Sequence, residues 1–313
     1  MTAGRASRRS GLQGLPRVAI TAGDPAGIGP EIAQKAAADA SVLAVCEPIL
    51  FEAAANAAIH PGDVSAAAGR AAFEVIVRAV DAAKRGDVDA IATAPVNKLA
   101  FSLTGLRWKG HTDLLAHLCD TPNVAMMFHS PQLKVVLLTV HVPLREVAAL
   151  VTAELVDRTI ALAVEAMHDF GLARPRLVVA GLNPHAGEAG VIGTEDERVL
   201  APAVARARAD GIDISGPLPG DTVFVRASRG EFDCVIACYH DQGLIPVKLL
   251  AFGQAVNVTI GLPIIRTSVD HGTAFDIAGK GIADPASMIA AVKLAAQMVH
   301  LRSSSPGGHG GKA

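Results

Sequence analysis

The sequence predicts an α/β protein with a mainly parallel sheet, because short apolar runs alternate with longer helical patterns along its 313 residues. Such alternation is typical of βαβ units around a mainly parallel sheet. Hydrophobic residues make up 50% of the chain, enough for one large core or two. The predicted strands cover residues 17–21, 88–93, 134–140, 176–181, 233–239 and 255–260.

Four helical patterns separate these runs, and most carry a recognisable start or stop. One ends at Gly86, and another begins after Thr152 as N-cap and ends before Gly171. A third closes at Gly211, and the last follows Pro285. No linker rich in proline and glycine divides the middle of the chain, and no fixed-period repeat is evident.

The first apolar run leads into a glycine-rich turn, ITAGDPAGIGPEIAQKA, at residues 20–36. It starts as the dinucleotide fingerprint G-x-G-x-x-G, but Ile32 stands where the third glycine belongs. No Gly-Lys-Ser/Thr follows, so it is not a P-loop either. The residues alone favour a strand-to-helix turn, with Pro30 at the start of the helix.

Composition excludes several classes of function. The net charge is −2 and aromatic residues are only 4%, which argues against nucleic-acid binding and base stacking. No segment is apolar enough for a membrane span, and the basic start is not followed by the apolar stretch of a signal peptide. We expect a cytoplasmic protein with disordered tails at 1–16 and 303–313. The cysteines are expected to be reduced core thiols: Cys46, Cys119, Cys234 and Cys238.

Three histidines follow predicted strands. His141, His185 and His240 come directly or within a few residues after the runs at 134–140, 176–181 and 233–239. Ligands of open α/β sheets bind beyond the carboxyl ends of the strands, so these imidazoles could converge on one metal. A histidine that is only hydrogen-bonded is the alternative for each of them.

Groups suited to an anion also recur. His111 and Thr112 form a compact donor pair in GHTD, and Lys248 and Arg266 stand among apolar residues in PVKLL and PIIRTS. With Asn257 they would suit a phosphate, although solvated surface charge is the ordinary reading of a lysine or arginine. A long glycine-rich loop, residues 269–285, follows Arg266 and precedes the last helix.

Taken together, these segments resemble the 4-hydroxythreonine-4-phosphate dehydrogenase family of vitamin B6 biosynthesis. The matching motifs occur in family order from about residue 17 to 300: GDPAGIGPE, GHTD, TVHVPLRE, GLNPHAGE, GPLPGDT, YHDQG and PIIRTSVDHGTAFDIAG. The family is similar in turn to the isocitrate and isopropylmalate dehydrogenases, which carry related glycine loops. The resemblance implies that two-domain fold rather than a Rossmann fold.

The implied domains are 17–104 with 259–302, and 105–258, the second carrying a homodimer interface. The glycine turn then belongs to the first domain, and NAD, or NADP, binds elsewhere. By resemblance the cofactor contacts lie in the later loop: His271, Gly272, Thr273, Ala274, Asp276, Ile277 and Ala278.

The resemblance also implies a divalent metal, zinc, magnesium, manganese or cobalt, bound by His141, His185 and His240 in a site shared between subunits. It assigns substrate and phosphate contacts to His111, Thr112, Lys248, Asn257 and Arg266. Asp221 and Asp241 match acidic positions near the metal, and the general base is Asp241 or a metal-bound water.

The expected reaction is oxidation and decarboxylation of 4-hydroxythreonine 4-phosphate to 3-amino-2-oxopropyl phosphate. Relatives in the family oxidise 4-phosphoerythronate or 4-phosphothreonate, and a further branch oxidises a terephthalate dihydrodiol. The retained GHTD and IIRTSVDHG motifs argue against the dihydrodiol but do not choose among the phosphorylated acids. A non-catalytic metabolite-binding relative is the remaining alternative. The chain is shorter than the family pattern between about Cys46 and Gly69, where hairpin strands are expected to be missing.

Overall fold

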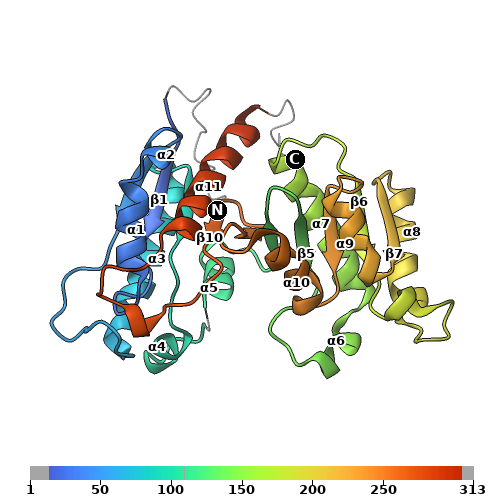
Figure 1. Cartoon of the computed structure of the whole chain (residues 1–313), viewed down its shortest axis with the longest axis horizontal. Helices are drawn as coiled ribbons and strands as arrows, with labels where there is room; N and C mark the ends of the chain where they lie inside the picture. The colour runs from blue at the N-terminus through green and yellow to red at the C-terminus, as the bar shows by residue number, and fades with distance from the viewer. Residues whose placement is uncertain (1–13, 109, 305–313) are drawn as a thin grey trace, which may run out of the picture. The chain divides into compact units, whose positions relative to one another are not determined.

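The computed structural model describes residues 14–108 and 110–304, which divide into two compact units. Unit 1 comprises the described residues up to Pro122 and from Leu262 onward, and unit 2 runs from Asn123 to Gly261 (Figure 1). Of the tails predicted at 1–16 and 303–313, residues 1–13 and 305–313 lie outside the described residues. Residues 14–16 are described, and Pro16 is buried and accepts a hydrogen bond from the Glu47 amide at 2.9 Å, so it is not part of a disordered tail. The last helix continues to Ser304, so residues 303–304 are helical and not part of a disordered tail.

Unit 1 contains a four-stranded parallel sheet with helices packed against it. The strands are β1 (Arg17–Thr21), β2 (Glu47–Phe51), β3 (Ala90–Thr93) and β10 (Ile265–Ser268), in the order β2-β1-β3-β10. Helices α3 and α11 pack on β1 and β3, whose side chains are almost fully buried. The helices are α1 (Gly29–Ala37), α2 (Ala40–Leu43), α3 (Ala66–Arg85), α4 (Lys98–Leu103), α5 (His111–Leu118) and α11 (Ala286–Ser304).

Unit 2 contains strands in the order β9-β4-β5-β8-β6-β7, where only β4 runs antiparallel to its neighbours. The strands are β4 (Ala125–His129), β5 (Lys134–Leu137), β6 (Leu177–Ala180), β7 (Ile214–Leu218), β8 (Cys234–Ala237) and β9 (Val256–Ile260). The helices are α6 (Leu144–Leu150), α7 (Ala153–Asp169), the short turns η1 (Pro184–Gly187) and η2 (Asp196–Leu200), α8 (Ala201–Ala209), α9 (Gly220–Ser228) and α10 (His240–Ala251).

The predicted helix ends are confirmed where a cap marks them. The hydroxyl of Thr152 accepts a hydrogen bond from the Leu155 amide at 3.3 Å, and Gly86 ends α3 in the left-handed region. The six predicted strands are present, and the α/β class with a mainly parallel sheet is confirmed. Residues 105–122, expected in the second domain, belong to unit 1, because α5 packs against α3.

The glycine-rich turn is a strand-to-helix connection. Asp24, 1% exposed, accepts a hydrogen bond from the Ala26 amide at 2.9 Å, and Gly23 has φ 67°. A Cβ on Gly23 would lie 2.3 Å from the Pro95 carbonyl oxygen, and one on Gly29 would lie 2.0 Å from that of Ala22. These glycines are required by close backbone approach, as in a tight turn.

Between β2 and α3 the chain is irregular, and no strand lies among residues 52–65. The region from about Cys46 to Gly69, where hairpin strands are expected to be missing, thus contains one strand, β2. The Gly62 amide donates to the Ala26 carbonyl at 2.8 Å, so the shortened segment is still tied to the glycine turn.

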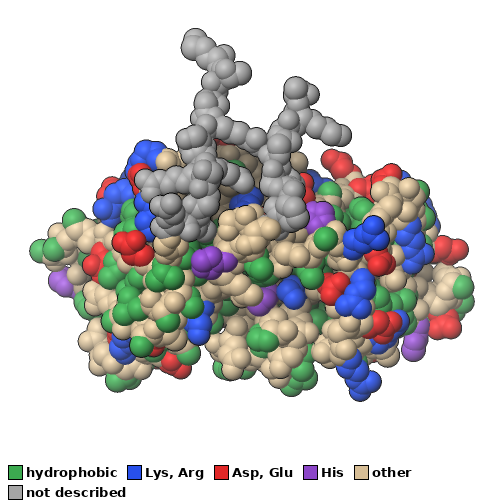
Figure 2. Space-filling model, turned by 90° about the horizontal axis from the view of Figure 1, so that it is seen from above, with side chains coloured by type: hydrophobic (Ala, Val, Ile, Leu, Met, Phe, Trp, Pro, Cys, Tyr) green, Lys and Arg blue, Asp and Glu red, His purple; other side chains and the backbone are tan. Residues whose placement is uncertain are grey.

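The four cysteines are free thiols, and all four are buried. Among the described helices, none combines the length and the apolar character that crossing a bilayer requires. Basic and acidic side chains are interspersed over the face shown in Figure 2, without a large patch of one sign. This surface offers no extended positive field for a polyanion.

Candidate active site

The three strand-end histidines all lie in unit 2, after neighbouring strands. The sheet order β5-β8-β6 places β8, which leads to His240, between the strands that lead to His141 and His185. The β5–β8 ladder continues past the strands, since the Leu138 amide donates to Ala237 at 2.8 Å. The Thr139 hydroxyl donates to the Cys238 carbonyl at the same distance. The carboxyl ends that carry these histidines are therefore held in fixed register.

The structure brings His141 and His240 together. Their ring centroids are 5.6 Å apart, with the planes tilted by 40°. His240 opens α10, and its Nδ1 lies 2.7 Å from Asp241 Oδ1. Because a carboxylate only accepts, His240 carries its proton on Nδ1 in this contact and presents Nε2 as a lone-pair donor. This is the arrangement by which a carboxylate orients a metal-binding imidazole.

His185 stands in an unusual turn. It and Ala186 have φ of 55° and 53°, in the left-handed region that non-glycine residues rarely adopt. Such strain of about 1–3 kcal/mol per residue persists only where the surroundings enforce it, and it clusters at functional sites. His141 shares the feature, with φ 52°.

Two residues that the sequence did not single out hold the His185 turn. Asp196 is 1% exposed and accepts from the Leu182 and Asn183 amides at 2.7 and 3.0 Å. Gln242 accepts from the Cys238 amide at 2.7 Å and donates to the Gly181 carbonyl at 2.6 Å, joining the β8 and β6 ends. The signal for both was weak: an acid in a helical pattern and the glutamine of YHDQG.

These donors fit a divalent metal in part. Imidazole nitrogens suit zinc, whereas magnesium and manganese prefer oxygen ligands. His240 has the carboxylate support expected of a ligand. Among the described residues, however, no three histidine, cysteine or acidic side chains are grouped closely enough to hold an ion. Two of the three predicted ligands, His141 and His240, converge, and His185 follows β6, the strand next to β8.

The remaining predicted site residues of unit 2 are spread over three elements. Asp221 is exposed in the first turn of α9, and Asp241 is exposed in the first turn of α10. Lys248 is half-buried near the end of α10. Asn257, on β9, has a buried Oδ1 with no hydrogen-bond partner among the described residues. A buried amide oxygen without a partner is costly and points to a missing donor.

Unit 1 holds a buried cation beside a buried imidazole. Arg266, on β10, is 2% exposed, and its Nη2 donates to the Thr93 hydroxyl at 2.7 Å. Burial lowers the pKa of Arg266 to about 9, which leaves it protonated at neutral pH. Thr93, on the neighbouring strand, was another residue that the sequence did not single out.

His111 opens α5 within the same unit. Burial, and then the charge of Arg266, hold its pKa well below the ordinary value, so the ring is neutral. The residue as a whole is half-buried, but its Nε2 is buried and has no hydrogen-bond partner among the described residues. Thr112, next along α5, is half-buried. A neutral imidazole with an unsatisfied nitrogen beside a guanidinium is suited to an anionic oxygen ligand.

The predicted cofactor loop is also in unit 1. Residues 271–278 include the 3-10 turn η3 (Phe275–Ile277), and Ala274 before it has φ 41°. His271, Gly272 and Asp276 are exposed, whereas the Thr273 carbonyl accepts from the Ile28 amide at 3.0 Å. A Cβ on Gly27 would lie 2.9 Å from the Thr273 carbonyl oxygen. The glycine turn therefore supports this loop directly.

The chain matches the family model "Pyridoxal phosphate biosynthetic protein PdxA" over residues 18–295. The chain belongs to the PdxA family. It is thus a dehydrogenase of that family, and the resemblance seen in its motifs is confirmed.

PdxA-family relatives with two different names match this chain about equally well. A 4-hydroxythreonine-4-phosphate dehydrogenase of Desulforapulum autotrophicum is 44% identical over 90% of this chain and 95% of its own. A D-threonate 4-phosphate dehydrogenase of Cupriavidus necator is 43% identical over 92% and 98%. The crystal structure of the 4-hydroxythreonine-4-phosphate dehydrogenase from Klebsiella pneumoniae superposes with a TM-score of 0.84, at 41% identity over 92% and 99%.

A terephthalate 1,2-cis-dihydrodiol dehydrogenase from Burkholderia xenovorans is more distant. Its structure gives a TM-score of 0.66 at 34% identity, covering 90% of this chain and 98% of its own. The lower similarity agrees with the motif-based argument against that branch.

Proposed function

We propose that this PdxA-family dehydrogenase oxidises a phosphorylated four-carbon hydroxy acid with NAD and then decarboxylates it. The favoured substrate is 4-hydroxythreonine 4-phosphate, which would give 3-amino-2-oxopropyl phosphate in vitamin B6 biosynthesis. The observation that carries the proposal is the buried Arg266 beside a neutral His111 whose Nε2 is unsatisfied. A phosphate oxygen would supply that partner, and its charge would offset the desolvation of the guanidinium.

The proposed binding residues contact different parts of the substrate. Arg266, His111 and Thr112 hold the phosphate, so that binding energy remote from the reacting carbon positions it. Lys248 and Asn257 are proposed as further substrate contacts, and the buried Oδ1 of Asn257 would accept a hydrogen bond from a substrate hydroxyl or ammonium group.

The first chemical step removes a hydride and a proton from the secondary alcohol. NAD, when bound at residues 271–278, would supply the acceptor for the hydride. The hydroxyl proton would pass to the carboxylate of Asp241, whose side chain is 73% exposed. Asp221, in the first turn of α9, is the second acidic residue that we propose to act near the metal. The product is a 3-keto acid. It then loses carbon dioxide, and the electrons of the broken C–C bond move onto the ketone oxygen before a proton is returned to carbon.

His141, His185 and His240 are the proposed ligands of a divalent metal. When bound, such an ion acts as a Lewis acid that stabilises negative charge on the substrate oxygen in both steps. The convergence of His141 and His240, and the support of His240 by Asp241, favour this assignment. NAD is assigned to residues 271–278, where the exposed carboxylate of Asp276 would accept hydrogen bonds from ribose hydroxyl groups. NADP is the alternative.

A homodimer with a shared site is part of the proposal, and we place the reaction in the cytoplasm, where free cysteines persist. The α10 face of unit 2 supports the dimer, because Ile245, Leu249 and Phe252 are 65%, 83% and 85% exposed. Light scattering should give twice the chain mass. A monomer at every concentration with full turnover would contradict the shared site.

A second candidate, D-threonate 4-phosphate oxidation, is favoured by the near-equal identity to relatives of both names. The two substrates differ at C2, which bears an amine in one and a hydroxyl in the other. The deciding experiment measures NADH absorbance with 4-hydroxythreonine 4-phosphate, 4-phosphothreonate, 4-phosphoerythronate and their dephosphorylated forms. Binding without turnover can be followed by the fluorescence of Trp108, the single tryptophan, three residues before His111. Ligand-induced quenching with no NADH would favour the non-catalytic binding alternative.

A further inference from the structure

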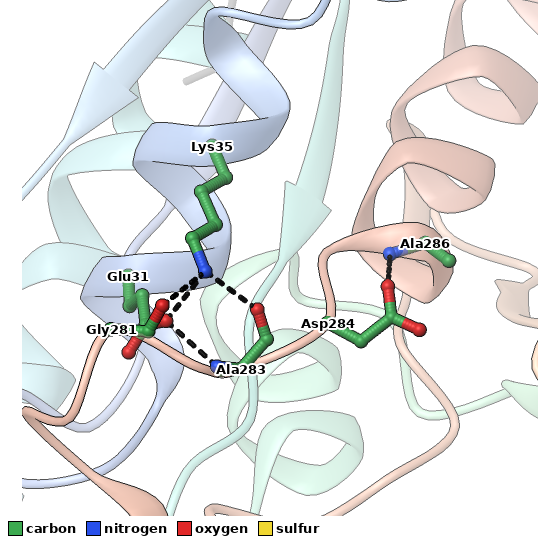
Figure 3. A network of polar contacts seen from close by, with 6 residues as sticks. All are labelled: Glu31, Lys35, Gly281, Ala283, Asp284 and Ala286. Atoms are coloured by element: carbon green, nitrogen blue, oxygen red, sulfur yellow. Dashed lines mark hydrogen bonds and ion pairs between the residues drawn. The ribbon is translucent and has the colours of Figure 1, made fainter.

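The loop at residues 271–285 is fastened to helix α1 by two charged side chains (Figure 3). Glu31 and Lys35 stand one turn apart on α1 and form an ion pair at 2.7 Å. Lys35 Nζ also donates to the carbonyls of Gly281 and Ala283, at 3.0 and 2.8 Å. The Ala283 amide donates back to Glu31 Oε1 at 2.8 Å. We call Glu31 and Lys35 the α1 clamp.

The clamp acts on backbone that otherwise has little to hold it. Residues 279–282 are exposed, and two of them, Gly279 and Gly281, are glycines with no side chain that could anchor the segment. Ala283, by contrast, is 1% exposed at the point where the clamp holds it. Next to it, Asp284 accepts from the Ala286 amide at 2.9 Å and caps α11 (Figure 3). Exposed loops with few buried contacts open at low free-energy cost, so these few bonds decide how ordered the loop is.

The same helix holds the other end of the loop through main chain. The Ile28 amide, at the start of α1, donates to the Thr273 carbonyl at 3.0 Å. Residues 273–283 are thus fixed at both ends to one helix, and the exposed residues between them include Asp276. An arrangement of this kind defines the shape of the intervening loop before any ligand binds.

The charges of the clamp are also well supported. The bond with Lys35 lowers the pKa of Glu31, so the carboxylate is charged at neutral pH. The side chains are only 16% and 38% exposed, which limits screening by solvent. Hydrogen bonds to charged groups are about twice as strong as neutral ones, so a lysine on two carbonyls is an effective tie.

We propose that Glu31 and Lys35 are positioning residues that hold the 271–284 loop in the conformation that binds the nicotinamide cofactor. This inference rests on the proposed function, which assigns NAD to residues 271–278. The ion pair and hydrogen bonds of both side chains go to each other and to the loop backbone, and we propose no direct contact between them and the cofactor. Their effect should therefore appear in the affinity for NAD and in the order of the loop, and not in the rate of the bound complex.

The test compares Lys35→Met, Glu31→Ala and Glu31→Gln with the wild-type protein. Lys84→Met is the matched control, because Lys84 likewise donates to a carbonyl, that of Leu118 at 2.9 Å, elsewhere in unit 1. Hydrogen exchange is measured over residues 271–285, NAD affinity by calorimetry, and kcat at saturating NAD. Exchange in the β8 segment of unit 2 checks that each variant is folded.

We expect faster exchange over 271–285 and an NAD Kd raised about tenfold in Lys35→Met and Glu31→Ala, a change comparable to the free energy of one charge-assisted hydrogen bond. We expect kcat to stay within about twofold, since the chemistry is untouched. Glu31→Gln keeps an acceptor for the Ala283 amide and should fall between. Lys84→Met should change neither quantity.

Two results would overturn the inference: unchanged exchange over 271–285, or faster exchange with unchanged NAD affinity. Failure of the proposed function is seen separately in the wild-type protein. If that protein binds no nicotinamide cofactor, the assignment of the loop is wrong. If the wild-type protein and the variants bind NAD with the same affinity, only the positioning role of Glu31 and Lys35 is wrong.

Discussion

Unit 1 buries the two main groups of its candidate phosphate site, the Arg266 guanidinium and the His111 Nε2, whereas unit 2 presents two of its three candidate metal ligands on exposed, strained turns. Arg266 is tied to Thr93 inside the sheet of unit 1, and the Nε2 of His111 is buried. In unit 2, His141 and His185 are exposed and have φ above 50°. Burial already shields the unit 1 groups from solvent, whereas the unit 2 histidines are oriented by the backbone conformation of exposed turns.

The difference indicates two kinds of ligand. A desolvated cation beside a neutral imidazole gains most from a ligand that brings a compensating charge, such as phosphate. Exposed imidazoles suit a metal that keeps open positions for substrate, and Asp196 and Gln242 of unit 2 would hold the turns before it binds. The predictions below test this contrast, beginning with the largest effect.

Replacing His240 with alanine should abolish bound metal and lower turnover by about 10³-fold or more, because several kcal/mol of charge stabilisation would be lost. Metal content by mass spectrometry and NADH production measure it. His141→Ala and His185→Ala should behave alike. The control is His168→Ala, an exposed histidine on α7 in the same unit. Full metal content in His185→Ala would remove that residue from the ligand set.

Acid should destabilise the protein through its buried histidines. His129, stacked on Phe170 with ring centroids 5.0 Å apart, has its pKa lowered to about 4, chiefly by burial. A depressed pKa means that the stabilisation is complete above the unfolded value of about 6.5 and is lost as pH falls through the folded value. A difference of that size corresponds to about 3 kcal/mol between pH 6.5 and 4.

The check is chemical denaturation of wild type and His129→Phe at pH 7 and pH 4.5. The phenylalanine keeps the stack and cannot titrate, so its stability should fall less on acidification. His168→Ala should follow the wild type. An identical acid loss in His129→Phe would show that other groups, including His111 in unit 1, dominate the pH dependence.

Replacing Arg266 with lysine should raise KM for the phosphorylated substrate about tenfold or more. This corresponds to a loss of about 1.5–3 kcal/mol of binding free energy. Lysine keeps the charge but cannot offer the planar fork that matches phosphate oxygens. The matched measurement uses the same acid without its phosphate, for which the loss should be small. An equal loss on both substrates would mean that Arg266 acts through the fold, by way of Thr93, and would reopen the non-phosphorylated diol reading.

The strands predicted from sequence were those buried on both faces, since continuous Val/Ile runs such as RVAIT leave few alternatives. Four strands were missed for identifiable reasons. β2 and β7 are sheet edges, half-exposed or interrupted by Gly216 and Pro217, so they lack that pattern. β4 contains two methionines and ends at His129, and β10 is only four residues long.

The histidines were found because strand ends can be read from sequence, and parallel strands end at one edge of a sheet. What supports them could not be found this way. Asp196 lies eleven residues beyond His185 and looks like an ordinary helix acid until the π turn η2 buries it. Thr93 and Arg266 are far apart in sequence and meet only through β3–β10 pairing. The contacts of these residues depend on how distant segments pair and pack, which the local sequence pattern does not reveal.

The smallest effect concerns the exposed end of unit 1, where Asp276→Ala should weaken NAD by about 1 kcal/mol, or fivefold, through the loss of a hydrogen bond to the ligand. Because Asp276 is exposed in η3, its loss should leave the melting temperature unchanged. Asp87→Ala, at an exposed acid elsewhere in unit 1, is the control for charge.

Gly27→Ala makes the contrasting variant, and the structure changes what should be expected of it. From sequence alone, the glycine turn and the 271–278 loop were expected to act separately, so that Gly27 would affect folding and Asp276 would affect NAD. A Cβ on Gly27 would press on Thr273 at 2.9 Å, so Gly27→Ala should lower both NAD affinity and the melting temperature. Asp276→Ala should lower only the affinity. If Asp276→Ala binds NAD like the wild type while Gly27→Ala does not, the cofactor contacts lie on another part of unit 1 than the 271–278 loop.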